Sequence, residues 1–179
     1  MNIQLRYFEY SDEQDIVDII NDEDVQRYLN ISILPYETED AENFIEYAKR
    51  NYISGGEQCF AITLDDKVIG SISYLLQSGC HACSASIGYY IGKKYWGRGI
   101  VPKAVDIIIE KIFDNPSTCR IYAEIFAKNT ASARVLEKCG FTYEGYLRNA
   151  ITKNGEVFDA KLYSFCLLYT SPSPRDSTS

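Results

Sequence analysis

The stretch that decides the fold is IGKKYWGRGIVPKA, residues 91–104. It holds two glycines spaced Gly-x-Gly and four cations, Lys93, Lys94, Arg98 and Lys103, although the chain carries a formal net charge of −7. An apolar segment precedes it and an apolar, helix-patterned segment follows. A glycine-rich turn between a strand and a helix exposes amide groups at the positive end of the helix dipole. The sequence therefore predicts an anion site here; the alternative is a tight turn with solvated lysines.

Composition and length set broad limits on what the chain does. With 179 residues and 46% apolar content, one domain is expected over residues 1–168. The Ser-, Thr- and Pro-rich residues 169–179 are predicted to be a disordered, non-native tail. Neither a secretory signal nor an apolar run of ~20 residues is visible, which favours a cytoplasmic protein without a membrane partner. The acidic balance argues against nucleic acid and suits a cationic substrate.

Hydrophobic periodicity and turn residues predict an ordered series of strands and helices. Ser11 and Gln14 have the spacing of a capping box at the start of the first helix. Antiparallel hairpins combined with a strand–helix–strand crossover indicate an α/β (α+β) fold, with a mixed sheet of about seven strands and about four helices on both faces. The expected strands are 3–8, 57–64, 67–76, 84–91, 119–126, 141–150 and 156–168, and the clearest helices are 38–51, 101–114 and a segment within 128–141.

Two motifs carry a family resemblance. The segment KYWGRG, residues 94–99, resembles the Q/R-x-x-G-x-G/A signature of GNAT acetyltransferases, with Lys94 in place of Gln or Arg. The segment NTASARVLEKCGF, residues 129–141, resembles the N-x-x-S…E-K-x-G-F helix of the same superfamily. Over residues 3–168 the chain is most similar to the branch of Rim-type ribosomal-protein N-terminal acetyltransferases and spermidine acetyltransferases. The dinucleotide fingerprint is excluded, because its third glycine falls on Pro102.

The resemblance implies a fold detail and a bound donor. GNAT proteins hold acetyl-CoA in a V-shaped split between two parallel strands, here 84–91 and 119–126. The pyrophosphate would lie on the turn after the first strand, and the pantetheine arm would pair with the backbone near Tyr90 and Ile91. An amide there would also stabilise the oxyanion. The residues expected to bind the donor are Tyr90, Ile91, Lys94, Gly97, Arg98, Gly99, Ile100, Val101, Asn129 and Ser132.

The chemistry of amine acetylation indicates which side chains to look for. A primary amine has a pKa near ~10, so roughly one molecule in a thousand is unprotonated at neutral pH. Glu124 is the candidate base, at a position where some relatives carry a catalytic glutamate; many relatives also have an acid where this chain has Ser86. Either Glu124 works alone or a water chain serves. Ser132 is the candidate acid, because the family's usual tyrosine corresponds to Leu136; helix capping around Asn129 is its structural alternative.

These features predict an N-acetyltransferase. It would move the acetyl group to a primary amine, such as a protein N-terminus, a polyamine or a similar cationic amine, by direct attack on the thioester. The alternative is a non-catalytic sensor that binds acyl-CoA. Cys80, His81 and Cys83 are interpreted as a loop rather than a metal site, because structural zinc usually takes four ligands. A homodimer is common in this branch, but no residue in the sequence demonstrates one.

Overall fold

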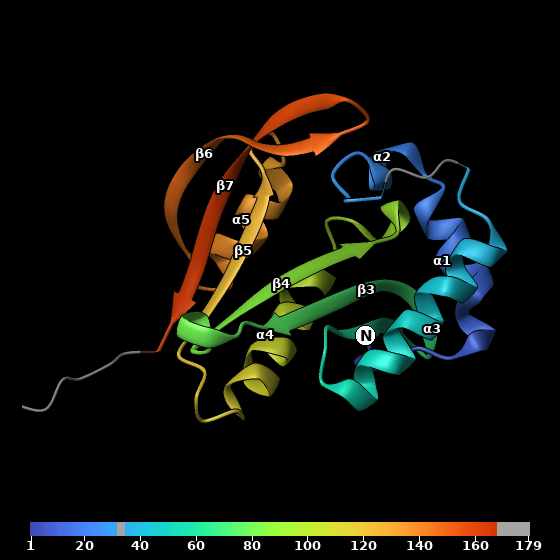
Figure 1. Cartoon of the computed structure of the whole chain (residues 1–179). Helices are drawn as coiled ribbons and strands as arrows, with labels where there is room; N and C mark the ends of the chain where they lie inside the picture. Colours follow the sequence, from blue (N-terminus) through green and yellow to red (C-terminus); the bar gives the residue numbers. More distant parts are fainter. Residues whose placement is uncertain (32–34, 168–179) are drawn as a thin grey trace, which may run out of the picture.

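One seven-stranded mixed sheet organises the chain, in the strand order β1-β2-β3-β4-β5-β7-β6 (Figure 1). The computed structural model describes residues 1–31 and 35–167, so the tail predicted at 169–179 lies outside the described residues. The strands are β1 (Ile3–Tyr7), β2 (Gln58–Leu64), β3 (Lys67–Leu76), β4 (Ser84–Ile91), β5 (Arg120–Phe126), β6 (Thr142–Lys153) and β7 (Glu156–Cys166). The α-helices of the described residues are α1 (Glu13–Ile20), α2 (Glu23–Gln26), α3 (Thr38–Ser54), α4 (Ile100–Phe113) and α5 (Thr130–Lys138).

The predicted V-shaped split is confirmed between β4 and β5. These parallel strands pair only from Ser84↔Arg120 to Ser86↔Tyr122. Beyond that point β4 stays paired with β3 as far as Ile91, whereas β5 stays paired with β7. The two strands therefore separate toward their carboxyl ends and leave backbone groups without a strand partner.

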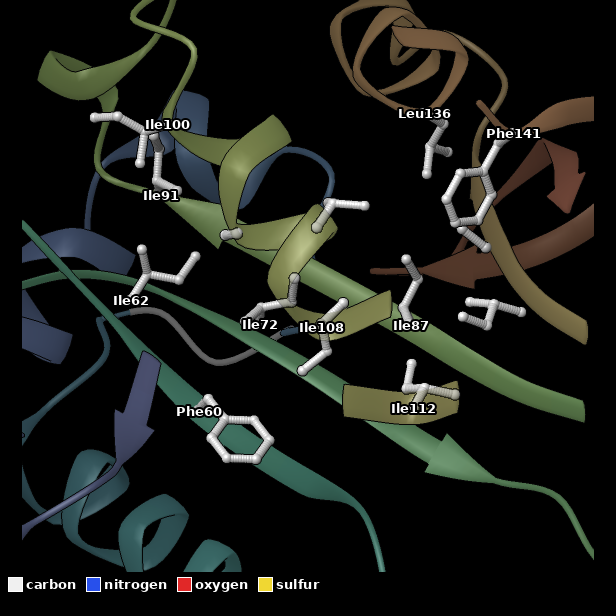
Figure 2. Close-up of a cluster of buried hydrophobic side chains, with 14 of the residues drawn as sticks. Phe60, Ile62, Ile72, Ile87, Ile91, Ile100, Ile108, Ile112, Leu136 and Phe141 are labelled. Atoms are coloured by element: carbon white, nitrogen blue, oxygen red, sulfur yellow. The ribbon is translucent and has the colours of Figure 1, made fainter. Parts of the chain in front are cut away.

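Helices cover both faces of the sheet, as the sequence predicted. On one face α4 and α5 form the larger core, in which Ile108 and Ile112 of α4 lie close to Ile87 of β4, and Leu136 of α5 lies near Phe141 (Figure 2). On the other face α1 and α3 pack against β2 and β3 through a second buried cluster that includes Ile16 and Ile45. The split between β4 and β5 thus lies between two separate hydrophobic cores, one on each face of the sheet.

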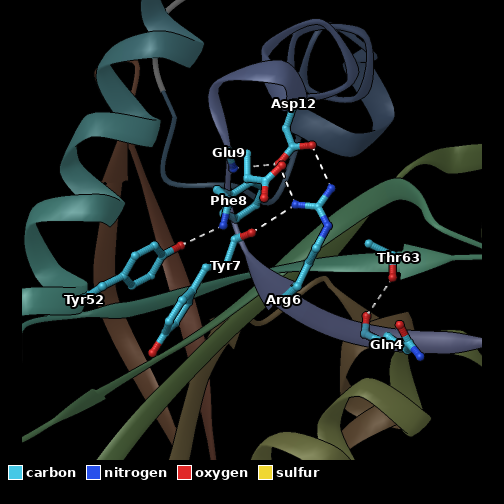
Figure 3. Close-up of polar contacts among 8 residues, drawn as sticks. All are labelled: Gln4, Arg6, Tyr7, Phe8, Glu9, Asp12, Tyr52 and Thr63. Carbon is cyan, nitrogen blue, oxygen red and sulfur yellow. Dashed lines mark hydrogen bonds and ion pairs between the residues drawn. The ribbon is translucent and has the colours of Figure 1, made fainter.

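The predicted capping box at Ser11 and Gln14 is wrong. The box is formed by Glu9 and Asp12, around a short 3-10 turn at Tyr10–Asp12 that precedes α1 (Figure 3). Arg6 of β1 donates two hydrogen bonds to the Asp12 carboxylate, at 2.8 Å each, and the Glu9 amide donates a third at 2.8 Å. Burial opposes ionisation of Asp12, but these bonds hold its pKa below the ordinary value. Arg6, on the strand that precedes α1, therefore helps to hold the start of the helix at Asp12.

The helix α2 is the element that the sequence did not predict. It has four residues, too few to show a 3.6-residue hydrophobic period. Its N-cap is Asp22, whose carboxylate accepts hydrogen bonds from the amides of Asp24 (2.9 Å) and Val25 (3.3 Å). In Figure 1 α2 lies beside the loop that joins β6 and β7. Among the described residues, no helix is both long and apolar enough to cross a membrane.

Candidate active site

The turn between β4 and α4 has free space beside its two glycines, Gly97 and Gly99. Gly97 and Gly99 have φ values of 71° and 74°, in the left-handed region that side chains other than glycine rarely adopt. A Cβ built at either position meets no atom within 4 Å. Backbone conformation rather than crowding therefore requires glycine. Gly99 is the N-cap of α4, so the first amides of the helix have no intrahelical acceptor.

The register of β4 decides which of its backbone groups face the split. The amide of Gly92 donates to the carbonyl of Ile69 (2.8 Å), and the amide of Gln77 donates to that of Ser84 (2.9 Å). In an antiparallel ladder the direction of the backbone groups alternates from residue to residue. The even-numbered residues of β4 therefore bond to β3, and the odd-numbered ones turn toward β5 and the split.

This alternation distinguishes the backbone groups of Tyr90 from those of Ile91. Tyr90 lies opposite Ser71 of β3, so its amide is engaged there. Tyr89 and Ile91 face the split instead. The indole Nε1 of Trp96 donates to the Ile91 carbonyl at 3.1 Å. The amide of Ile91 and both backbone groups of Tyr89 are left as the open edge of β4.

At the start of α5 two side chains fix Ser132. The Oδ1 atom of Asn129, the N-cap of the helix, accepts the amide of Ser132 at 3.1 Å. The hydroxyl oxygen of Tyr89 lies 2.7 Å from Ser132 Oγ and 3.4 Å from the Ser132 carbonyl oxygen. Burial raises the pKa of Tyr89, so its phenol stays protonated near neutral pH. The sequence prediction missed Tyr89, because strand tyrosines are usually packing residues.

One cavity of about 460 Å³ joins these parts. Its lining also includes Asp24, Arg27, Tyr28 and Leu29, from the segment around α2. Because α2 contacts α1, which lies on the face opposite α4, the cavity runs through the split from one face of the sheet to the other. Of the residues predicted from the sequence, those that line it are Tyr90, Ile91, Gly97, Arg98, Gly99, Ile100, Val101, Asn129 and Ser132.

Two predicted residues, Lys94 and Glu124, lie outside the lining of this cavity. Lys94 lines a second, smaller cavity, and its Nζ lies 5.2 Å from the centre of the Tyr95 ring. Its neighbour Lys93 is bonded to Asp24. Of the four cations in the opening stretch, only Arg98 lines the larger cavity.

The cavity draws its other cations from elsewhere. Arg134 and Lys138 of α5 both line it, four residues apart on one side of the helix. Their spacing within residues 129–141 was the available signal, but the sequence predicted only Asn129 and Ser132 of this segment as binding residues. The positive charge thus comes from the turn after β4, from the exposed side of α5 and from Arg27, which is paired with Asp24.

Glu124 is exposed, on the face of β5 opposite α4. Its neighbours Ala123 and Ile125 both belong to the core beneath α4, so the alternation of strand side chains directs Glu124 to the other face. The ring of Tyr28 packs against Phe126 on that same face, with centroids 5.6 Å apart. Glu124 therefore projects on the side of the sheet where the segment around α2 lies.

A lysine from the β6–β7 hairpin holds the segment around α2 in place. The Nζ of Lys153 donates to three backbone carbonyls, those of Gln26 (2.5 Å), Leu29 (2.7 Å) and Arg27 (3.4 Å). Burial lowers the pKa of Lys153, and the three carbonyls offset the loss of water around its ammonium group. No pattern in the sequence indicates this contact.

The Cys80–Cys83 segment forms a loop between β3 and β4, as predicted, with a 3-10 turn at Gly79–His81. Across the residues that the structure describes, no group of three or more His, Cys, Asp or Glu side chains is arranged to hold a metal ion.

Comparison with known proteins identifies the family. Residues 2–142 match the Acetyltransferase (GNAT) domain. The chain belongs to the GNAT acetyltransferase family. The resemblance drawn from the two motifs is confirmed, and so is the expectation of a GNAT-type acyltransferase.

Similar proteins support the same placement within the GNAT family. The chain is 28% identical over 165 residues to the uncharacterized N-acetyltransferase p20 of Bacillus licheniformis, covering 90% of this chain and 91% of p20. It is 26% identical over 140 residues to the ribosomal-protein-serine acetyltransferase of Escherichia coli, covering 78% of each. The solved structure of the microcin C7 self-immunity acetyltransferase MccE, in complex with acetyl-CoA and AMP, superposes with a TM-score of 0.83 at 25% identity and 92% coverage of both chains.

Proposed function

We propose that this GNAT protein transfers the acetyl group of acetyl-CoA to a primary amine by direct attack of the amine on the thioester. The observation that carries the proposal is the single cavity that joins the turn at Gly97–Val101, the open edge of β4 and the hydroxyl of Ser132. Acetyl-CoA is also the ligand of the similar MccE structure. The domain responsible would be residues 1–168.

The residues present fit acetyl-CoA in three ways. The amides from Gly97 to Val101 are suited to a pyrophosphate, because nothing fills the space outside the two glycines. The amide and carbonyl of Tyr89 and the amide of Ile91 offer a strand edge to the pantetheine arm. Arg98, together with Arg134 and Lys138, supplies positive charge for the phosphates. We call these parts, Tyr89–Val101 and Asn129–Lys138, the donor end of the cavity.

The segment Asp24–Leu29, held by the β6–β7 hairpin, forms what we call the acceptor end. The two ends lie on opposite faces of the sheet, so the amine would reach the thioester through the split. Glu124 would take the proton from the amine, directly or through water, because it projects on the acceptor side of β5. Ser132 would hold the proton that the leaving sulfur needs, since its hydroxyl lines the donor end.

The acceptor is proposed as a cationic amine: a protein N-terminus, a polyamine or a similar compound. The net charge of −7 favours the approach of a cation. A protein acceptor also fits the Escherichia coli relative, which is a ribosomal-protein-serine acetyltransferase.

An acceptor screen tests the proposal. Thiol release from acetyl-CoA would be measured with peptides beginning in serine or alanine, with spermidine and with kanamycin, and the matching N-acetylated peptides would serve as controls. Turnover of at least one free amine, and of none of the blocked peptides, is expected. Tight binding of CoA without turnover on any amine would instead support a sensor of acyl-CoA.

A further inference from the structure

The contact between Tyr89 and Ser132 joins the two arms of the V. Tyr89 lies on β4 and Ser132 on the first turn of α5, which follows β5. Both line the donor end of the cavity, and their hydroxyl oxygens are 2.7 Å apart. The pair lies where the strands have separated, beyond the last backbone pairing at Ser86 and Tyr122. A hydrogen bond between side chains at this place orients the Ser132 hydroxyl, and it does not extend the pairing of β4 with β5.

Either hydroxyl can donate across this 2.7 Å contact, and Tyr89 makes a second contact with the same residue. The Tyr89 hydroxyl also lies 3.4 Å from the carbonyl oxygen of Ser132, which can only accept a hydrogen bond. Two arrangements satisfy both contacts: the hydrogen of Tyr89 lies between the two Ser132 oxygens, or Ser132 Oγ donates to Tyr89 while Tyr89 donates to the carbonyl. We take the first arrangement, in which the hydrogen on Ser132 Oγ is not used by Tyr89. In the described part of the chain, Tyr89 is the one residue whose side chain is within hydrogen-bond distance of Ser132 Oγ.

We propose that Tyr89 is a positioning residue for proton delivery: by donating to Ser132 Oγ, it turns the serine hydrogen toward the cavity, where the leaving sulfur requires it. The inference rests on the proposed acid role of Ser132. Asn129 fixes the backbone of the serine and Tyr89 fixes its side chain, so the donor needs no reorientation when the thiolate leaves. Because the phenol keeps its own proton near neutral pH, Tyr89 remains a donor under working conditions.

A double-mutant cycle tests this role, with acetyl-CoA and the panel amine that the wild-type protein turns over fastest. Ser132→Ala is expected to lower kcat by about 10²-fold. Tyr89→Phe removes only the phenol oxygen and is expected to lower kcat about fivefold, the rate equivalent of one hydrogen bond, with the KM for acetyl-CoA unchanged. In the Ser132→Ala background, Tyr89→Phe is expected to have no further effect, because the group that it positions is gone.

Tyr163→Phe is the matched control. Tyr163 is a buried tyrosine that donates to Glu137 near the far end of α5, at 3.1 Å and away from the cavity lining. It is expected to keep kcat within about twofold, while both Phe variants lose similar amounts of thermal stability.

The outcomes separate the two proposals. An unchanged kcat in Tyr89→Phe, or an equal loss from Tyr89→Phe with and without Ser132, would overturn the positioning role while leaving acetyl transfer intact. An unchanged kcat in Ser132→Ala would remove the acid role and the inference with it. The absence of wild-type turnover on every amine would contradict the proposed function itself.

Discussion

The donor end of the cavity comes from two continuous stretches of sequence, whereas the acceptor end is assembled from segments up to 127 residues apart. At the donor end, each part follows from local rules: glycines at positive φ, the start of α4, and an asparagine N-cap on α5. At the acceptor end, a four-residue helix is held by a lysine from a distant hairpin. The shape of the donor end therefore depends mainly on secondary structure, whereas that of the acceptor end depends on tertiary contacts.

The largest expected effect falls on Glu124, the proposed base on the acceptor side of β5. Glu124→Gln should lower kcat by about 10²-fold, because the amide cannot accept the proton of the amine. The pH–rate profile should also lose its acid limb, since that limb reports the protonation of the base. Glu57→Gln, whose carboxylate binds Ser73 and Tyr47 away from the split, provides a comparison. A retained acid limb in Glu124→Gln would assign the base to a water chain or another group.

A donor-end change should act on CoA and spare the acceptor. Gly99→Val places a branched side chain in the open space of the turn and at a φ of 74°. Loss of about 2 kcal/mol of phosphate contacts would weaken CoA binding roughly thirtyfold. Gly99→Ala carries the same backbone strain with a smaller side chain, so its CoA affinity should lie between those of the wild type and Gly99→Val. Calorimetric titration with CoA measures the difference, and wild-type affinity in Gly99→Val would mean that the phosphates bind elsewhere.

A change at the acceptor end should weaken the use of the amine and leave the use of acetyl-CoA unaffected. Lys153→Met removes the ammonium group that binds the carbonyls of Gln26, Arg27 and Leu29. The freed segment should raise the KM for the amine roughly tenfold and leave the KM for acetyl-CoA within twofold. Lys161→Met, on the other strand of the same hairpin, is the control. An equal rise in both KM values would show that the two ends are not independent.

The same contrast explains what the sequence could predict. The strand series was visible because turn chemistry and hydrophobic period are local properties. The split and the site residues were implied by the family resemblance, and nine of those residues line the cavity. The helix α2 and its contact with Lys153 were not visible, because the hairpin is distant in the chain. The Glu9–Asp12 box was missed although Arg6 lies only six residues before Asp12. Tyr89 was hidden for another reason: strand tyrosines are usually packing residues, and the register of β4 against β3, which decides which backbone groups face the split, is not a local property.

The smallest expected effect concerns the charges of the donor end, where sequence and structure point to different residues. The sequence predicted a role for Lys94, whereas the cavity is lined by Arg134 and Lys138. At low salt, Arg134→Gln and Lys138→Gln should each weaken CoA binding about two- to fivefold, because both are exposed cations beside a solvated polyanion. Their effects should shrink as salt screens the phosphates.

Lys94→Gln, which changes the charge by the same amount, should alter the affinity for CoA by less than about twofold. Its ammonium group lies over the Tyr95 ring, and the residue lines the other cavity. If Lys94→Gln weakens binding more than either α5 variant, the phosphates lie along the turn after β4 and not against α5, and the prediction from the sequence is the better one.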